Sequence, residues 1–133
     1  MNELFEIAKM AKEIRDNEKK LLNTWKGEME ANQRTIRDNL LAELQEICPE
    51  AKAYNTAWIE ERRYDIMGIH MPNPIFPDCG WLWTLVYPYI DTTGNVVLWV
   101  NCRKDADTKS DKNIRGEIMT RESFARRVLI DYV

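Results

Sequence analysis

The first 47 residues constrain the fold most, because they contain one glycine and no proline. Glu, Lys, Leu, Ala and Arg dominate this stretch, and such a composition favours helix throughout. Apolar residues recur at alternating spacings of three and four, and Glu18 is the single polar interruption. These positions are Leu4, Ile7, Ala11, Ile14, Leu21 and Trp25. We call them the N-terminal seam; their spacing is the a/d pattern of a coiled coil.

A second set of apolar residues continues at helical spacing, in a register offset by a four-residue stutter. It comprises Met29, Ile36, Leu40, Leu44 and Ile47. The polar stretch around Gly27 leaves two interpretations, one long helix or a hairpin of two helices. We favour one long helix, straight or kinked, because Gly27 is the only turn residue there. Pro49 stands where a chain leaving a helix often carries proline.

A helix of this length is too long for the remaining chain to cover, so the N-terminal seam needs a partner chain. Packing of the seam on the chain's own sheet is the alternative. The seam is narrow, and charged residues occupy most of the other positions in residues 3–25, whereas a core-facing stripe is usually wider. We therefore expect a homodimer, with residues 1–48 as the helical dimerisation segment and residues 49–133 as a sheet domain.

The second half of the chain changes to strand-like patterning. We expect strands near residues 54–60 and 64–71, then an extended loop with three prolines. Residues 81–90 and 96–103 flank a loop that ends in Gly94, which predicts a hairpin with a type I turn and a G1 bulge. This loop places Tyr87 opposite Trp99 and Trp83 opposite Arg103. Thr120 is expected to cap a helix from residue 121 to about residue 132.

The predicted fold class is therefore α+β. It has a long N-terminal helix, an antiparallel sheet of about four strands and a short C-terminal helix. Strands bracketed by helices favour a sheet with its helices on one face.

One face of the predicted hairpin is aliphatic and the other is aromatic. The aromatic face carries Trp81, Trp83, Tyr87, Tyr89, Trp99 and Arg103. If exposed, such a face is typical of a protein-binding surface; if a helix covers it, it is ordinary core. A third interpretation is a stacking platform for single-stranded nucleic acid beside Arg103, Lys104, Arg126 and Arg127. The net charge of −3 disfavours nucleic acid as the partner.

The sequence offers little catalytic chemistry. His70 is the only histidine, so a Cys–His enzyme would need it beside Cys79 or Cys102. No nucleophile signature accompanies these residues, and we expect no catalytic residue. The acidic run from Asp105 resembles a calcium loop but has Ser110 and Gly116 where glycine and glutamate are required. We therefore expect neither a metal nor a cofactor.

The three cysteines are far apart and lack zinc-ligand spacing. Free thiols are typical of a reducing compartment, which predicts a cytoplasmic protein. No apolar run reaches membrane-spanning length, and the N-terminus is acidic, unlike a secretory signal.

These observations favour a small acidic, non-enzymatic protein that acts by binding another protein, as an inhibitor, adaptor or immunity-type factor. Two alternatives stay open. One is a nucleic-acid-binding protein that uses the aromatic face, and the other is a small enzyme built around His70 and a cysteine.

Overall fold

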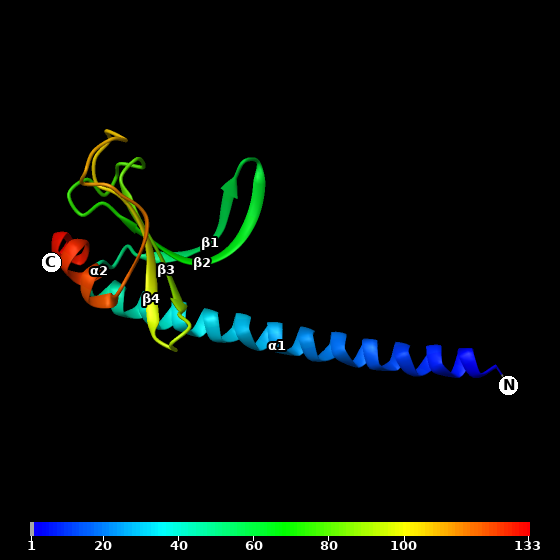
Figure 1. Cartoon of the computed structure of the whole chain (residues 1–133). Helices are drawn as coiled ribbons and strands as arrows, with labels where there is room; N and C mark the ends of the chain where they lie inside the picture. The colour runs from blue at the N-terminus through cyan, green and yellow to red at the C-terminus, as the bar shows by residue number, and fades with distance from the viewer. Residues whose placement is uncertain (1) are drawn as a thin grey trace. The chain divides into compact units, whose positions relative to one another are not determined.

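The computed structural model describes residues 2–133, except for the side chains of residues 25, 26, 29, 30, 57–59, 64 and 65. It confirms the α+β class (Figure 1). The elements are α1 (Glu3–Ile47), β1 (Lys52–Ile59), β2 (Arg62–Pro72), β3 (Trp83–Ile90), β4 (Val96–Arg103), β5 (Ile114–Met119), α2 (Arg121–Arg127) and the 3-10 helix η1 (Leu129–Tyr132).

The N-terminal stretch is one continuous helix, α1, so the hairpin alternative is wrong. The backbone N–H of Cys48 closes the last turn on the carbonyl of Leu44, 2.7 Å away, and Pro49 follows. The chain divides into two compact units, residues 1–32 and residues 33–133. The division falls inside α1, so the last turns of this helix belong to the same unit as the sheet.

The sheet has five antiparallel strands in chain order, one more than the sequence predicted. The missed strand is β5, which pairs Met119 with Leu98 of β4. Its sequence, IRGEIM, has polar residues and a glycine at its centre, so its alternation is too short to recognise. β1 and β2 lie close to their expected positions. The turn between them consists of Glu60 and Glu61, both with positive φ, a conformation that usually selects glycine or asparagine.

The hairpin of β3 and β4 has the predicted register, with Tyr87 opposite Trp99 and Trp83 opposite Arg103. Its turn also matches, because Gly94 has φ 84° and the Asp91 carboxylate accepts backbone N–H bonds from Thr93 and Asn95. The hydroxyl of Thr93, which also donates to this carboxylate, contributes most to holding the pKa of Asp91 below its usual value, and the backbone bonds add to the shift. β3 begins at Trp83, however, so Trp81 lies in the preceding turn and not on the strand.

The aliphatic face of the sheet, which we call the inner face, holds the core of residues 33–133. Val86, Leu98 and Val100 are fully buried there, under Leu44 of α1 and Phe124 of α2. Thr120 caps α2 as predicted, accepting a bond from the Ser123 N–H at 3.1 Å. The predicted single C-terminal helix is instead α2 followed by η1.

Two polar side chains one turn apart on α1 also contact the sheet. Gln33 donates to the carbonyl of Pro88, and the Arg37 guanidinium donates to Asn55 Oδ1 at 2.7 Å and to the Gly68 carbonyl at 3.4 Å. Asn55 lies between Tyr54 and Thr56, where the pairing of β1 with β2 shifts register. Arg37 is buried, and its bond to the Gly68 carbonyl satisfies an acceptor that is also buried.

We expect Arg37→Met to lower the free energy of unfolding by about 2 kcal/mol, because it removes the charge-assisted hydrogen bonds to Asn55 and to the buried carbonyl of Gly68. Urea denaturation of the variant measures this loss. Arg34→Met is the control: Arg34 is an exposed cation on the same helix, and its loss should change stability by less than about 0.5 kcal/mol. Equal effects of the two substitutions would contradict the role of Arg37.

Candidate functional site

A row of residues crosses the outer face of the sheet, opposite the core. Tyr54 of β1 pairs with Gly68 of β2, Tyr87 of β3 pairs with Trp99 of β4, and Trp99 pairs with Ile118 of β5. Gly68 lies under the Tyr87 ring, because a Cβ at position 68 would meet Tyr87 Cε1 at 2.7 Å. Paired residues share a face, so the row is continuous.

The two central rings of this row pack on each other and on glycines. The Tyr87 and Trp99 ring centroids are 5.0 Å apart at 66°, an edge-to-face contact. Gly116 of β5 has φ 66°, and a Cβ there would lie 2.9 Å from Trp99 Cζ2. Burial raises the pKa of Tyr87 to about 12, and the nearby Tyr54 adds to this shift. Both glycines are needed for the rings to lie against the sheet.

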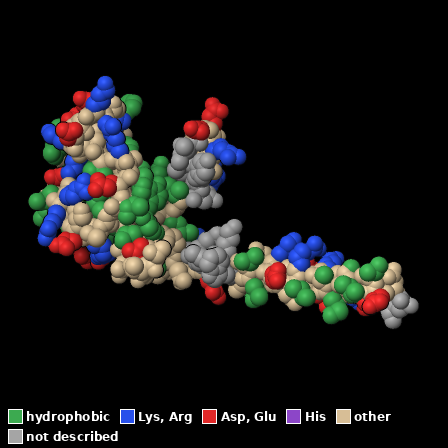
Figure 2. Space-filling view, viewed as in Figure 1, with side chains coloured by type: hydrophobic (Ala, Val, Ile, Leu, Met, Phe, Trp, Pro, Cys, Tyr) green, Lys and Arg blue, Asp and Glu red, His purple; other side chains and the backbone are tan. Residues whose placement is uncertain are grey.

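The predicted partner-binding residues are neither core nor a fully exposed patch. Trp83, Tyr87, Tyr89, Trp99 and Arg103 are half-buried, while Trp81, before β3, is 70% exposed. Figure 2 shows hydrophobic side chains gathered on the sheet unit beside the hairpin of β1 and β2. Part of each ring's surface is already used in packing within the sheet.

The cations proposed for nucleic-acid binding are largely paired with carboxylates. Lys104 bonds to Asp131, Arg126 lies 2.6 Å from Glu122, and Arg127 lies 2.6 Å from Glu117. Within the part of the chain that the structure describes, Arg103 alone of the four has no carboxylate partner, and it donates to the Ala106 carbonyl. Paired cations attract phosphate less, so this arrangement gives the nucleic-acid alternative little support.

The sheet separates His70 from Cys102, one of the two cysteines considered for a catalytic pair. His70 pairs with Lys52 and Leu85 on the outer face, whereas Cys102 is buried on the inner face beside Thr84. Cys79 is half-buried in the loop between β2 and β3. Burial raises the pKa of Cys102, so its thiol stays protonated at neutral pH. Burial and Lys52 lower the pKa of His70, whose Nδ1 is buried and has no hydrogen-bond partner among the described side chains.

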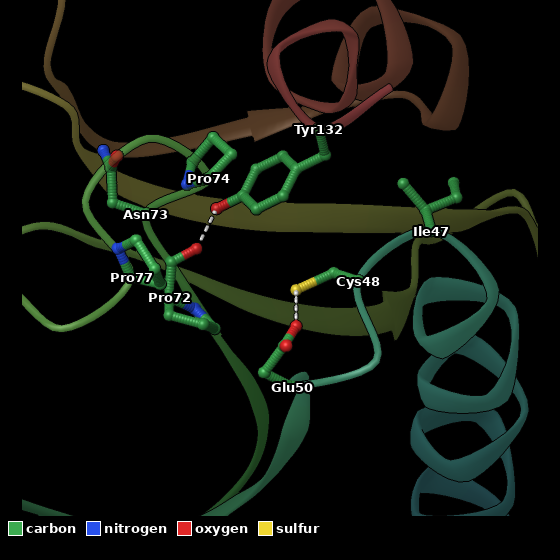
Figure 3. A pocket seen from close by; sticks show the side chains of 8 residues that line it. All are labelled: Ile47, Cys48, Glu50, Pro72, Asn73, Pro74, Pro77 and Tyr132. Carbon is green, nitrogen blue, oxygen red and sulfur yellow. Dashed lines mark hydrogen bonds between the residues drawn. The ribbon is translucent and has the colours of Figure 1, made fainter.

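A small pocket of about 200 Å³ lies at the end of α1 (Figure 3). Its lining includes Cys48, Glu50, Pro72, Asn73 and Tyr132. The Cys48 Sγ lies 3.9 Å from a carboxylate oxygen of Glu50. Burial first, and the negative charge of Glu50 second, raise the pKa of this thiol, so it is not an activated nucleophile.

The Tyr132 hydroxyl starts a hydrogen-bonded chain that leads from this pocket into the core. It donates to the Pro72 carbonyl at 2.9 Å, so it accepts from Thr84 Oγ1 at 3.1 Å. A hydroxyl has one proton, and therefore the Cys102 thiol donates to Thr84, also at 3.1 Å. Burial raises the pKa of Tyr132 well above its usual value. Each thiol or hydroxyl proton of Cys102, Thr84 and Tyr132 is used in this series of hydrogen bonds. The series therefore has a structural role.

The N-terminal seam forms a different kind of site. Every side chain from residue 2 to residue 24 is exposed. The large apolar members of the seam are 56–76% exposed: Leu4, Ile7, Ile14 and Leu21. The side chain of Trp25 lies outside the described residues. Figure 2 shows hydrophobic side chains interspersed with charged ones along this part of α1.

The exposed apolar surface of this segment is wider than the seam. Met10 and Leu22, which flank the seam at g and e positions, are also exposed, as is Phe5. The sequence already indicates this wider surface, because Phe5, Met10 and Leu22 each stand next to a seam residue. A search for strict a/d spacing does not include them.

Comparisons with protein-family models, with curated proteins and with solved structures found no match. The described residues contain no group of three or more side chains arranged to hold a metal ion. Nor does any described helix combine the length and apolar character that crossing a bilayer requires.

We expect wild-type stability to fall as the pH drops below about 6.5, and His70→Gln to remove that part of the pH dependence. Because the folded state lowers the pKa of His70, the unfolded chain binds the proton first, and protonation favours unfolding. Urea denaturation at about pH 7 and about pH 5 measures the difference. His70 is the only histidine, so other groups contribute little in this window. Identical pH dependence in both proteins would contradict the prediction.

Proposed function

We propose that this chain is a non-catalytic protein-binding protein that associates with a second copy through its N-terminal seam. The observation that carries the proposal is the exposure of the seam's large apolar side chains along a regular helix. Burying each such side chain against a partner contributes roughly 1.5–3 kcal/mol, a strong driving force for association. A coiled coil is the arrangement that buries apolar side chains at this spacing.

The sheet unit supplies the second part of the proposal, a surface for a different protein. Trp83, Tyr87, Tyr89, Trp99 and Arg103 share the outer face, and tryptophan, tyrosine and arginine are the residue types enriched at binding hot spots. Rings that are already packed against the sheet lose little conformational entropy when a partner binds. An inhibitor, adaptor or immunity-type factor would use such a face.

An enzymatic function has less support. Cys102, a candidate nucleophile, lies on the opposite face of the sheet from His70, and burial holds its thiol in the protonated form.

The self-association is tested with Ile14→Glu. A charge in the middle of the seam must be desolvated on pairing, so we expect the apparent dissociation constant to rise at least roughly tenfold. Sedimentation equilibrium over a range of protein concentrations measures it. Asn23→Glu adds the same charge on the opposite side of the helix, at an f position, and should leave association unchanged. A wild-type protein that stays monomeric at high concentration would refute this part of the proposal.

The outer face is tested by affinity capture with the double variant Trp83→Ala/Trp99→Ala. We expect the wild type to capture a protein from a cell lysate and to retain it after nuclease treatment. The double variant should not capture it. Phe76→Ala, which removes an exposed aromatic ring from the loop before β3, is the control and should retain it. Capture that disappears with nuclease would instead favour the nucleic-acid alternative. Equal capture by all the variants would exclude the outer face as the binding surface.

A further inference from the structure

The N-terminal seam also carries information about the direction of pairing. We propose that two copies pair through it in the antiparallel direction, with Leu4 of one helix opposite Leu21 of the other. This inference rests on the self-association proposed above and adds the identity of the partner surface and its register.

A parallel pair in register would place each seam residue opposite itself. Two of the resulting layers are defective. Ala11 would face Ala11, which leaves a gap between two small side chains in the middle of the seam. Glu18 would face Glu18, which brings two carboxylates together in a partly desolvated interface, where like charges repel strongly.

An antiparallel pair places each a residue opposite a d residue. The seam then gives three kinds of layer, each occurring twice: Leu4 with Leu21, Ile7 with Glu18, and Ala11 with Ile14. The small residue faces a large one, so no gap forms. The charged residue faces an apolar one, so its methylene groups cover Ile7 while its carboxylate reaches water at the edge of the seam.

The positions that flank the seam do not favour the parallel direction. Oppositely charged pairs between e and g positions usually select the direction of a coiled coil. Here the e positions are Ala8, Arg15 and Leu22, and the g positions are Glu3, Met10, Asn17 and Thr24. In a parallel pair their contacts would be Glu3 with Ala8, Met10 with Arg15, and Asn17 with Leu22, and none of these pairs opposite charges. The seam residues therefore decide the direction.

The exposed flanking residues fit the same arrangement. In the antiparallel register Met10 approaches Asn17 of the other copy, and Ala8 approaches Arg15, so no like charges meet at the flanks. Met10 and Leu22, both exposed in the single helix, add apolar surface along the two edges of the pair.

Disulfide trapping tests the direction. Leu4→Cys and Leu21→Cys are each made with Cys79→Ser, because Cys79 is half-buried while Cys48 and Cys102 are buried. One of the two proteins carries a size tag, and the mixture is oxidised. In the proposed pair residues 4 and 21 face each other, whereas two residues 4 lie about 26 Å apart, 17 residues at 1.5 Å each. We expect the mixed disulfide to form roughly tenfold faster in the mixture than either protein links to itself.

A second pair of variants, Ile7→Cys and Glu18→Cys in the same background, tests the same register at another layer and guards against a substitution that weakens pairing. Rapid linkage of Leu4→Cys to itself would overturn the antiparallel direction while leaving self-association intact. Equal linkage in all mixtures would overturn the register. If sedimentation shows only monomer for the wild type, both the direction and the self-association fail.

Discussion

Burial of the aliphatic inner face of the sheet is the constraint on which residues 33–133 depend. Val86, Leu98 and Val100 are apolar and fully buried. Leu40 and Leu44 of α1 cover them, together with Phe124 of α2 and Val128, the residue after that helix. Gln33 and Arg37 attach the last turns of α1 to the sheet by donating to the Pro88 carbonyl and to Asn55 Oδ1. Apolar burial supplies the driving force, and the polar contacts select one alignment of helix and sheet.

The same helix carries two apolar registers with different environments. The second register enters the core through Leu40 and Leu44, while the first, the N-terminal seam, has its described large apolar side chains exposed. The division between the compact units, after Asn32, falls in the polar stretch between the registers. A stutter changes the face that a helix presents, which allows one helix to serve an internal core and an external partner.

The outer face of the sheet is organised around glycine and aromatic residues. Gly68 and Gly116 give the rings of Tyr87 and Trp99 room to lie against neighbouring strands, where larger residues would displace them. The polar groups that contact Tyr132, near the C-terminus, are also hydrogen-bonded to one another. The thiol of Cys102 bonds to the hydroxyl of Thr84, which bonds to the hydroxyl of Tyr132. Each proton of these three groups is therefore used in a hydrogen bond within the fold.

Local patterns in the sequence predict the fold class, the long helix, the register of the β3–β4 hairpin and the Thr120 cap. These features depend on local periodicity and turn chemistry, which a chain carries within a few residues. Only the folded chain reveals β5, whose polar centre obscures the alternation expected of a strand, and the start of β3 after Trp81. It also reveals that His70 and Cys102 lie on opposite faces of the sheet, that Arg126 and Arg127 are paired with carboxylates, and that two glycines support the aromatic rings. These outcomes depend on contacts between residues far apart in the chain, which no local pattern records.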